Sequence, residues 1–132
     1  MDSFHEQRKY PRIFFPGNDV VLAKILPAVG GASFDARLLN ISEGGLGFHL
    51  KRSVDIRLKA NDSLRLLALV GDPHLAEVAD LDMEVRWVMD EDYLDHVAVG
   101  CEFMNLDDHN RRQLQDFVLV ALSEHKEPGA SS

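Results

Sequence analysis

The chain has 132 residues, of which 45% are hydrophobic and 27% are charged, so it can form one globular domain but is too short for two. Its 22 acidic and 14 basic residues give a formal net charge of −8, which argues against non-specific binding of DNA or RNA. No apolar run approaches the roughly 20 residues of a membrane-spanning helix. The N-terminus also lacks the order of a secretory signal, so we expect a cytoplasmic protein.

Residues 1–18 are polar, contain two prolines and are predicted to form a flexible N-terminal arm. Within this arm, Arg8 and Arg12 lie four positions apart on a segment that Pro11 keeps out of a helix. An arginine side chain can donate two parallel hydrogen bonds to a phosphate or to the O6 and N7 atoms of guanine. The spacing alone is weak evidence, since it is more typical of a solvated basic arm.

Six segments after the arm alternate between apolar and polar residues or are short and apolar, and turn residues separate them. The expected strands cover residues 20–26, 33–41, 46–50, 64–70, 83–89 and 97–103. After these strands, the apolar residues recur with the spacing of one helix face. Asp107 or Asp108 can cap the start of this helix. The apolar positions of this face are Leu114, Phe117, Val118, Ala121 and Leu122.

This order of elements predicts a mainly β fold, in which a six-stranded antiparallel barrel carries a C-terminal α-helix packed on it. A closed barrel leaves no sheet edge, which suits apolar runs on so many strands. We expect the barrel and the helix to cover residues 19–124. Residues 125–132 contain Pro128 and Gly129 and are predicted to be a disordered tail.

The segment Asn40-Ile41-Ser42-Glu43-Gly44-Gly45 closes the second expected strand at a turn. Asn40 and Ser42 share one strand face, and both can reach outward to the edge of a base. Gly44 and Gly45 let the backbone turn tightly and permit the close approach of a ligand. A plain hairpin turn stabilised by the serine is the alternative interpretation.

The sequence gives little support for catalysis or for metal binding. Cys101 shares a strand face with apolar residues and is predicted to be a buried structural thiol rather than a nucleophile. Asp90-Glu91-Asp92 is predicted to be a solvated hairpin tip, with a metal site as the alternative. The six histidines show no close metal-ligand spacing. We therefore expect no catalytic residue, no metal and no enzyme.

The two motifs occur in a fixed order, Arg8-x-x-x-Arg12 before the first strand and Asn40-x-Ser42-x-x-Gly45 at the end of the second. This order resembles the PilZ family of cyclic-di-GMP receptors, whose signature is Arg-x-x-x-Arg followed by Asp/Asn-x-Ser-x-x-Gly. Members of that family have a six-stranded antiparallel barrel and a C-terminal helix. The resemblance covers nearly the whole chain, including the strand at 99–103 and the helix after it.

The resemblance implies that Arg8 and Arg12 bind the phosphates and guanine edges of cyclic-di-GMP. It implies that Asn40 and Ser42 bind a guanine base, and that Gly45 keeps the turn open. Asn40 stands where many members carry Asp, so this position keeps an oxygen acceptor for guanine N–H groups but lacks the charge.

Four further residues complete the expected ligand site: Gln7, Lys9, Gly44 and Trp87. Gln7 and Lys9 occupy places where some relatives carry extra arginines, and Gln7 leaves open whether one ligand or a stacked pair binds. Trp87 stands where some relatives have an aromatic residue that contacts a guanine. Its strand parity with Met83 and Val85 predicts instead that it packs in the core.

The resemblance therefore implies a cyclic-di-GMP effector or adaptor without a cofactor, whose arm folds across the ligand and whose changed surface is read by a protein partner. We expect no nucleic-acid polymer as partner and no membrane insertion, and a monomer, with a dimer left open. One alternative is a PilZ-like protein-interaction module that does not bind the nucleotide. A second is a small hydrolase using an acidic pair such as Asp90 and Asp92.

Overall fold

The computed structural model describes residues 10–15, 19–28, 30–53, 56–91 and 95–131, and burial is described as far as Glu124. Gln7, Arg8 and Lys9 of the expected site therefore lie outside the described residues. The described part contains seven strands, one short 3-10 helix and one α-helix. Their bounds are β1 Ile13–Phe14, β2 Leu22–Pro27, β3 Phe34–Ile41, β4 Gly45–Lys51, β5 Ser63–Val70, η1 Pro73–Leu75, β6 Leu81–Met89, β7 His96–Met104 and α2 Asp108–Ser131.

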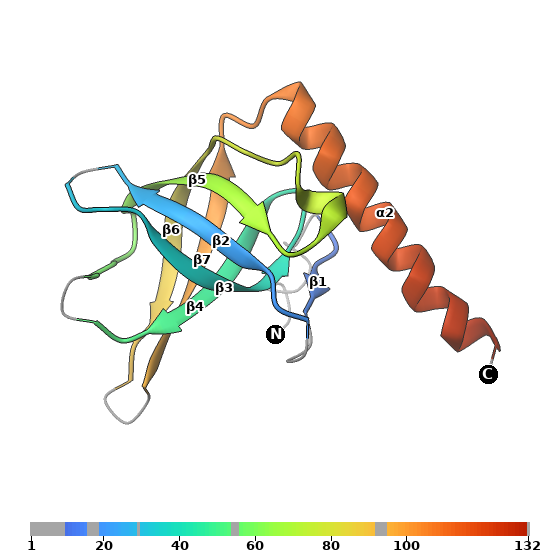
Figure 1. Ribbon diagram of the computed structural model, residues 1–132, viewed down its shortest axis with the longest axis horizontal. Coiled ribbons are helices and arrows are strands. Elements are labelled where there is room, and N and C mark those ends of the chain that lie inside the picture. Colours follow the sequence, from blue (N-terminus) through green and yellow to red (C-terminus); the bar gives the residue numbers. More distant parts are fainter. Residues whose placement is uncertain (1–9, 16–18, 29, 54–55, 92–94, 132) are drawn as a thin grey trace, which may run out of the picture.

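The strands form one antiparallel sheet in the order β1-β3-β2-β5-β6-β7-β4, and a further pairing between β3 and β4 closes it. Strands β2 to β7 thus make a closed six-stranded barrel, and β1 is an additional strand on β3 (Figure 1). The predicted fold class, a mainly β barrel followed by a helix, is confirmed. Each of the six expected strands is present, with ends that differ by up to two residues from the predicted bounds.

Strand β1 lies inside the segment 1–18 that we expected to be a flexible arm. Its Ile13 pairs with Ile41 and its Phe14 pairs with Asn40. Ile13 is only 5% exposed and belongs to the barrel core, because its side chain joins the apolar cluster beneath β3. The sheet therefore includes two residues of the segment predicted to be the arm.

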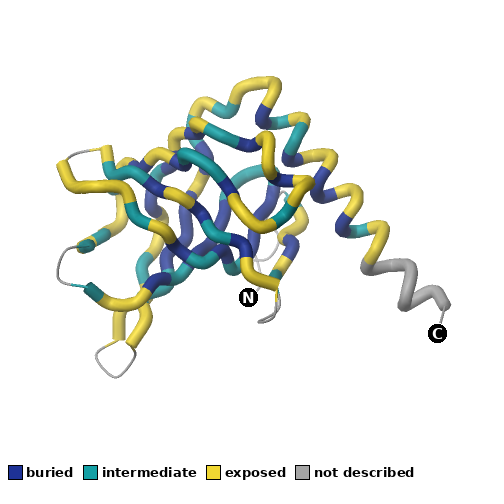
Figure 2. Tube along the Cα trace, viewed as in Figure 1, coloured by how far each residue is buried: buried dark blue, intermediate teal, exposed yellow. Residues whose placement is uncertain are grey.

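Side chains from all six barrel strands fill the interior, and Figure 2 shows buried positions recurring along these strands. Burial of these aliphatic and aromatic groups is the main favourable term for the fold, at roughly 25 cal/mol per Å² of apolar surface. The largest fully buried side chains on strands are Ile25, Leu38, Ile41, Phe48, Leu66, Leu81, Met83, Val85 and Val99.

Helix α2 packs on the barrel through the face that the sequence predicts. Leu114, Phe117, Val118 and Ala121 are buried, and the rings of Phe15 and Phe117 stack with centroids 6.0 Å apart. At the start of α2 the backbone N–H of Asn110 donates to Asp107 Oδ1 at 2.8 Å, so Asp107 is the capping residue.

The backbone of α2 continues to Ser131, through most of the segment 125–132 that we expected to be a disordered tail. Figure 1 shows this helix running past the barrel. Among the described residues, no helix has the length and apolar character needed to cross a membrane.

Candidate functional site

The turn between β3 and β4 is held by the side chain of Ser42. The backbone N–H of Gly44 donates to Ser42 Oγ at 3.1 Å, and the Ser42 hydroxyl donates to the carbonyl of Gly45 at 3.4 Å. The Ser42 N–H donates to the same carbonyl at 2.8 Å. Ser42 is only 7% exposed, and guanine binding by its hydroxyl stays a prediction. In this structure the hydroxyl fixes the shape of the turn.

Asn40 is also buried, at 8% exposure, and it does not point out to solvent as expected. Asn40 follows the alternation of the buried Ala36 and Leu38 along β3, and Leu39 is the extra residue where the pairing of β3 with β4 becomes irregular. The Asn40 side chain lies against Gly47, where an added methyl group would come within 3.0 Å of Asn40 Nδ2. Gly47 therefore makes room for this amide on the neighbouring strand.

Gly45 allows β4 and β7 to approach each other closely. A Cβ atom at Gly45 would lie 2.2 Å from the carbonyl oxygen of Cys101, a backbone atom that the barrel holds in place. The next hydrogen bond, from the N–H of Phe103 to the carbonyl of Gly44, measures 2.9 Å and joins the turn to β7. The requirement for glycine at position 45 is thus a close backbone contact rather than the freedom to turn.

Tyr10, midway between the two arginine positions of the arm, lies on this turn. A methyl group at Gly44 would come within 2.9 Å of Cδ2 of the Tyr10 ring, so the ring rests directly on the glycine. The arm and the turn are therefore in contact, although Tyr10 and Gly44 are 34 positions apart in the sequence. Sequence reasoning missed Tyr10, and its place between the two arginines was the available signal.

The arm, the turn, the outer surface of β6 and β7 and the beginning of α2 enclose an open hollow of about 760 Å³. Five of the expected site residues line it: Arg12, Ser42, Gly44, Gly45 and Trp87. Asn40 does not. The size falls within the range of about 300–1,000 Å³ that small-molecule sites occupy. The other lining residues are Tyr10, Glu43, Leu46, Arg86, Gly100, Cys101, Glu102, Phe103, Asn105, Leu106 and Arg111.

Trp87 points toward the solvent, so the prediction that it packs in the core is wrong. The pairing of β6 with β7 is irregular between Val85 and Trp87, and this β-bulge shifts the alternation by one residue. Trp87 is 41% exposed, and its indole lies over Gly100, where a Cβ atom would fall 2.1 Å from Nε1. The glycine thus lets a flat aromatic ring lie along one wall of the hollow.

Two more arginines line the hollow, and both have acidic partners. Arg86 Nε donates to Glu102 Oε1 at 2.7 Å, and its Nη2 lies 3.4 Å from Glu84 Oε1. Arg111 Nη1 lies 3.6 Å from Glu43 Oε2. Neither arginine was predicted, because residues on β6 and α2 meet the turn only once the barrel has closed.

Cys101 is buried as predicted, and burial raises the pKa of its thiol to about 12. The folded protein should therefore react with iodoacetamide at pH 8 roughly a hundredfold or more slowly than the urea-unfolded chain, since the thiolate is the reactive form. Mass spectrometry of the quenched reaction measures both rates. Equal rates would contradict a buried thiol.

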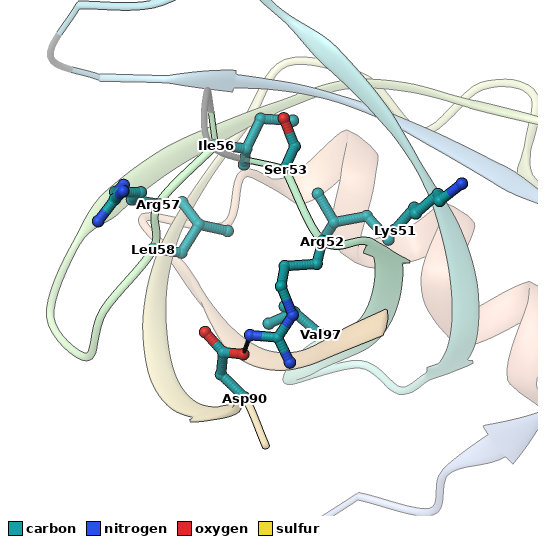
Figure 3. Close-up of a pocket in the computed structure, with 9 residues that line it drawn as sticks. Lys51, Arg52, Ser53, Ile56, Arg57, Leu58, Asp90 and Val97 are labelled. Atoms are coloured by element: carbon teal, nitrogen blue, oxygen red, sulfur yellow. Dashed lines mark hydrogen bonds and ion pairs between the residues drawn. The ribbon is translucent and has the colours of Figure 1, made fainter. Parts of the chain in front are cut away.

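A second hollow, of about 460 Å³, lies where β4 and β6 end and β7 begins, at the end of these strands away from the turn (Figure 3). Arg52 crosses this space and donates to the Asp90 carboxylate and to the Glu91 carbonyl. Asp90 is thus engaged in an ion pair, while Asp92 lies outside the described residues. Among the residues that the structure describes, no three His, Cys, Asp or Glu side chains are grouped to hold a metal.

Two histidines that the sequence did not connect meet on neighbouring strands, with His49 and His96 ring centroids 5.2 Å apart. Burial, followed by the charges of His96 and Arg37, lowers the pKa of His49 below its usual value. Neither histidine lines either hollow.

Similar folds occur in three solved structures of bacterial proteins. The first, described as the PilZ domain with c-di-GMP of YcgR from Escherichia coli, has a TM-score of 0.73 and 17% identity, and the match covers 96% of this chain and 99% of that one. The K. pneumonia MrkH–c-di-GMP complex follows with a TM-score of 0.68, 19% identity and coverage of 92% and 54%. The Bacillus subtilis inhibitor of motility, MotI/DgrA, has a TM-score of 0.66, 17% identity and coverage of 89% and 52%.

The chain thus spans almost all of the YcgR domain but only about half the length of the MrkH and MotI chains. At these identities the likeness establishes the fold. A comparison with curated proteins gives no match. The family model of the PilZ domain matches residues 6–119, which include both motifs, the whole barrel and the first half of α2, and the chain therefore belongs to the PilZ domain family.

Proposed function

We propose that this protein is a receptor for cyclic-di-GMP. The observation that carries the proposal is the meeting of Arg12, the Ser42–Gly45 turn and Trp87 around one hollow. Two of the structures with a similar fold are described with c-di-GMP. The ligand needs cationic donors for its two phosphates and flat surfaces for its two guanine bases, and the hollow offers both.

Each group has a distinct role in this proposal. Arg12, with Arg8, binds phosphate and guanine edges through the planar guanidinium fork. The indole of Trp87 provides a face on which a guanine can stack. Ser42 and the two glycines hold the turn at a shape that leaves the hollow open. Guanine binding by Asn40 stays a prediction, since its amide is buried beside Gly47 in this structure.

We further propose that the arm folds across the bound ligand and that the resulting surface is recognised by a protein partner. The contact between Tyr10 and Gly44 supports this step, because it already joins the arm to the turn. The protein would act in the cytoplasm, and its single, buried Cys101 agrees with a reducing compartment.

Isothermal titration calorimetry with cyclic-di-GMP tests the proposal, and Trp87 fluorescence reports the same event from inside the site. We expect a saturable heat and a saturable change in the emission of this sole tryptophan, with a stoichiometry that distinguishes one ligand from a stacked pair. GMP, which has one base and one phosphate, should bind far more weakly and serves as the control ligand. The absence of heat and of an emission change at high micromolar cyclic-di-GMP would contradict the proposal.

One observation favours the alternative function, a protein-interaction module that does not bind the nucleotide. Glu43 and Glu102 line the hollow, and each holds one of its arginines. Two carboxylates oppose the entry of a dianion. If the protein is such a module, calorimetry with cyclic-di-GMP should show no binding although the protein is folded.

We propose no catalytic role, and the hydrolase alternative has a direct test. Asp90 is bound by Arg52 and therefore is poorly placed to act as a base. Chromatography after prolonged incubation with cyclic-di-GMP should return the ligand unchanged. The appearance of a linear dinucleotide or of GMP would show turnover instead.

A further inference from the structure

Glu43 lies in the Ser42–Gly45 turn and connects this turn to α2. Its Oε2 atom accepts a hydrogen bond from Gln115 Nε2 at 2.9 Å and lies 3.6 Å from Arg111 Nη1. The Glu43 side chain is only 18% exposed. Arg111 and Gln115 are four positions apart, so they lie on the same face of the helix and reach the same carboxylate.

The backbone of α2 is well fixed at this point. The N–H of Arg111 donates to the carbonyl of Asp107 at 2.9 Å, and the Asn110 side chain is bound to both backbone groups of Ala79 at 3.1 and 2.9 Å. The helix start therefore stays in place, and only the long side chain of Arg111 needs to move to change its partner.

The Arg111 guanidinium lies at the hollow, and its ion pair with Glu43 is weak. The N–O distance of 3.6 Å exceeds that of a hydrogen bond, and the arginine side chain is 42% exposed. An anionic ligand in the hollow would meet this cation beside Arg12 and Arg86. A phosphate can accept two parallel hydrogen bonds from the guanidinium, which the pair with Glu43 does not provide at this distance.

We propose that Arg111 is a further phosphate-binding residue and that Glu43 competes with the ligand for it. This inference rests on the proposed function, since it assigns a residue of α2 to the cyclic-di-GMP site. When the phosphate takes Arg111, Glu43 keeps its hydrogen bond to Gln115 but loses its cation. Ligand binding therefore removes one of the two contacts that Glu43 makes with α2, which couples the helix to the occupied site.

Four variants test the competition by calorimetry with cyclic-di-GMP: Arg111→Gln, Glu43→Gln, the double variant, and Arg112→Gln as the matched control. Arg112 is the next residue of the same helix, is exposed and does not line the hollow. We expect Arg111→Gln to weaken binding about tenfold and Arg112→Gln to leave it within about twofold. Glu43→Gln keeps an oxygen that can accept from Gln115 but removes the charge, and it should tighten binding severalfold.

The double variant separates competition from a general effect of charge. If Glu43 acts by holding Arg111, Glu43→Gln changes nothing in the Arg111→Gln background. Equal tightening in both backgrounds would overturn the competition, and equal binding by Arg111→Gln and wild type would overturn the role of Arg111. Wild-type protein that binds no ligand would instead remove the proposed function, together with this inference.

Nuclear magnetic resonance of the wild-type protein gives a second measurement that needs no variant. The Arg111 Nε–Hε signal and the side-chain amide of Gln115 should both shift on saturation with cyclic-di-GMP. The Nε–Hε signal of Arg65, which is paired with Asp82 and does not line the hollow, should stay unchanged. An unmoved Arg111 signal in the saturated complex would contradict the proposal.

Discussion

Replacing Arg12 by alanine is expected to abolish measurable binding of cyclic-di-GMP. Arg12 is exposed and lines the hollow between the arm and the turn. Two charge-assisted hydrogen bonds contribute roughly 1.5–3 kcal/mol each, so their loss weakens binding by at least about a hundredfold. The ligand-free barrel should keep its thermal transition, since removal of an exposed side chain changes stability by about 0.5 kcal/mol or less.

Calorimetry and thermal unfolding of the same samples check both halves of this expectation. Arg65→Ala is a suitable control, because Arg65 is an exposed arginine paired with Asp82 at 2.7 Å and does not line the hollow. It should bind like the wild type. Undiminished binding by Arg12→Ala would refute the proposal that the arm binds the ligand, whatever the result for the control.

The second large effect is expected from Gly45→Ala, and it should act on stability. The new Cβ atom would lie 2.2 Å from the carbonyl oxygen of Cys101, and both atoms belong to strands that the barrel closes on each other. Overpacking of this kind costs about 1–3 kcal/mol and sometimes more. We expect a loss near the top of that range, which lowers the melting temperature by about 10 °C.

Gly100→Ala is the matched comparison, because it places a methyl group on the neighbouring strand at a nominally shorter distance. That group would lie 2.1 Å from Trp87 Nε1, but the obstacle is an exposed side chain that can rotate away. The stability change should be small, while the emission of Trp87 should change. Unfolding in urea measures both variants. A larger loss for Gly100→Ala than for Gly45→Ala would contradict the role assigned to the backbone contact.

The sequence predicts the parts of this molecule that depend on local periodicity. Alternation along β4 and along β7 and the helical spacing of Leu114 and Phe117 each determine which face is buried, and the closed barrel follows from six such strands. The two motifs also predict the turn and the end of the arm, because their residues lie close to one another in sequence.

The exposure of Trp87 depends on irregular pairing between strands. Trp87 follows a point where β6 has an extra residue against β7, and the parity of the side chains changes there. The sequence near Trp87 gives no sign of this change, whereas the burial of Asn40 follows the alternation of Ala36 and Leu38 along β3. Tyr10 and Arg111 were not predicted for a different reason, because each contacts the turn from a position far away in the sequence.

The pairing of β1 with β3 has a consequence for how the first arginine of the motif can act. Arg8 lies five residues before Ile13, and a fully extended chain spans at most about 3.3–3.6 Å per residue, so Arg8 stays within roughly 18 Å of that anchored strand. If cyclic-di-GMP binds as proposed, a tether this short gives the Arg8 guanidinium an effective concentration in the millimolar range or higher around a ligand already held by Arg12. The second capture is then an intramolecular event, whose rate does not depend on how much protein the cell contains.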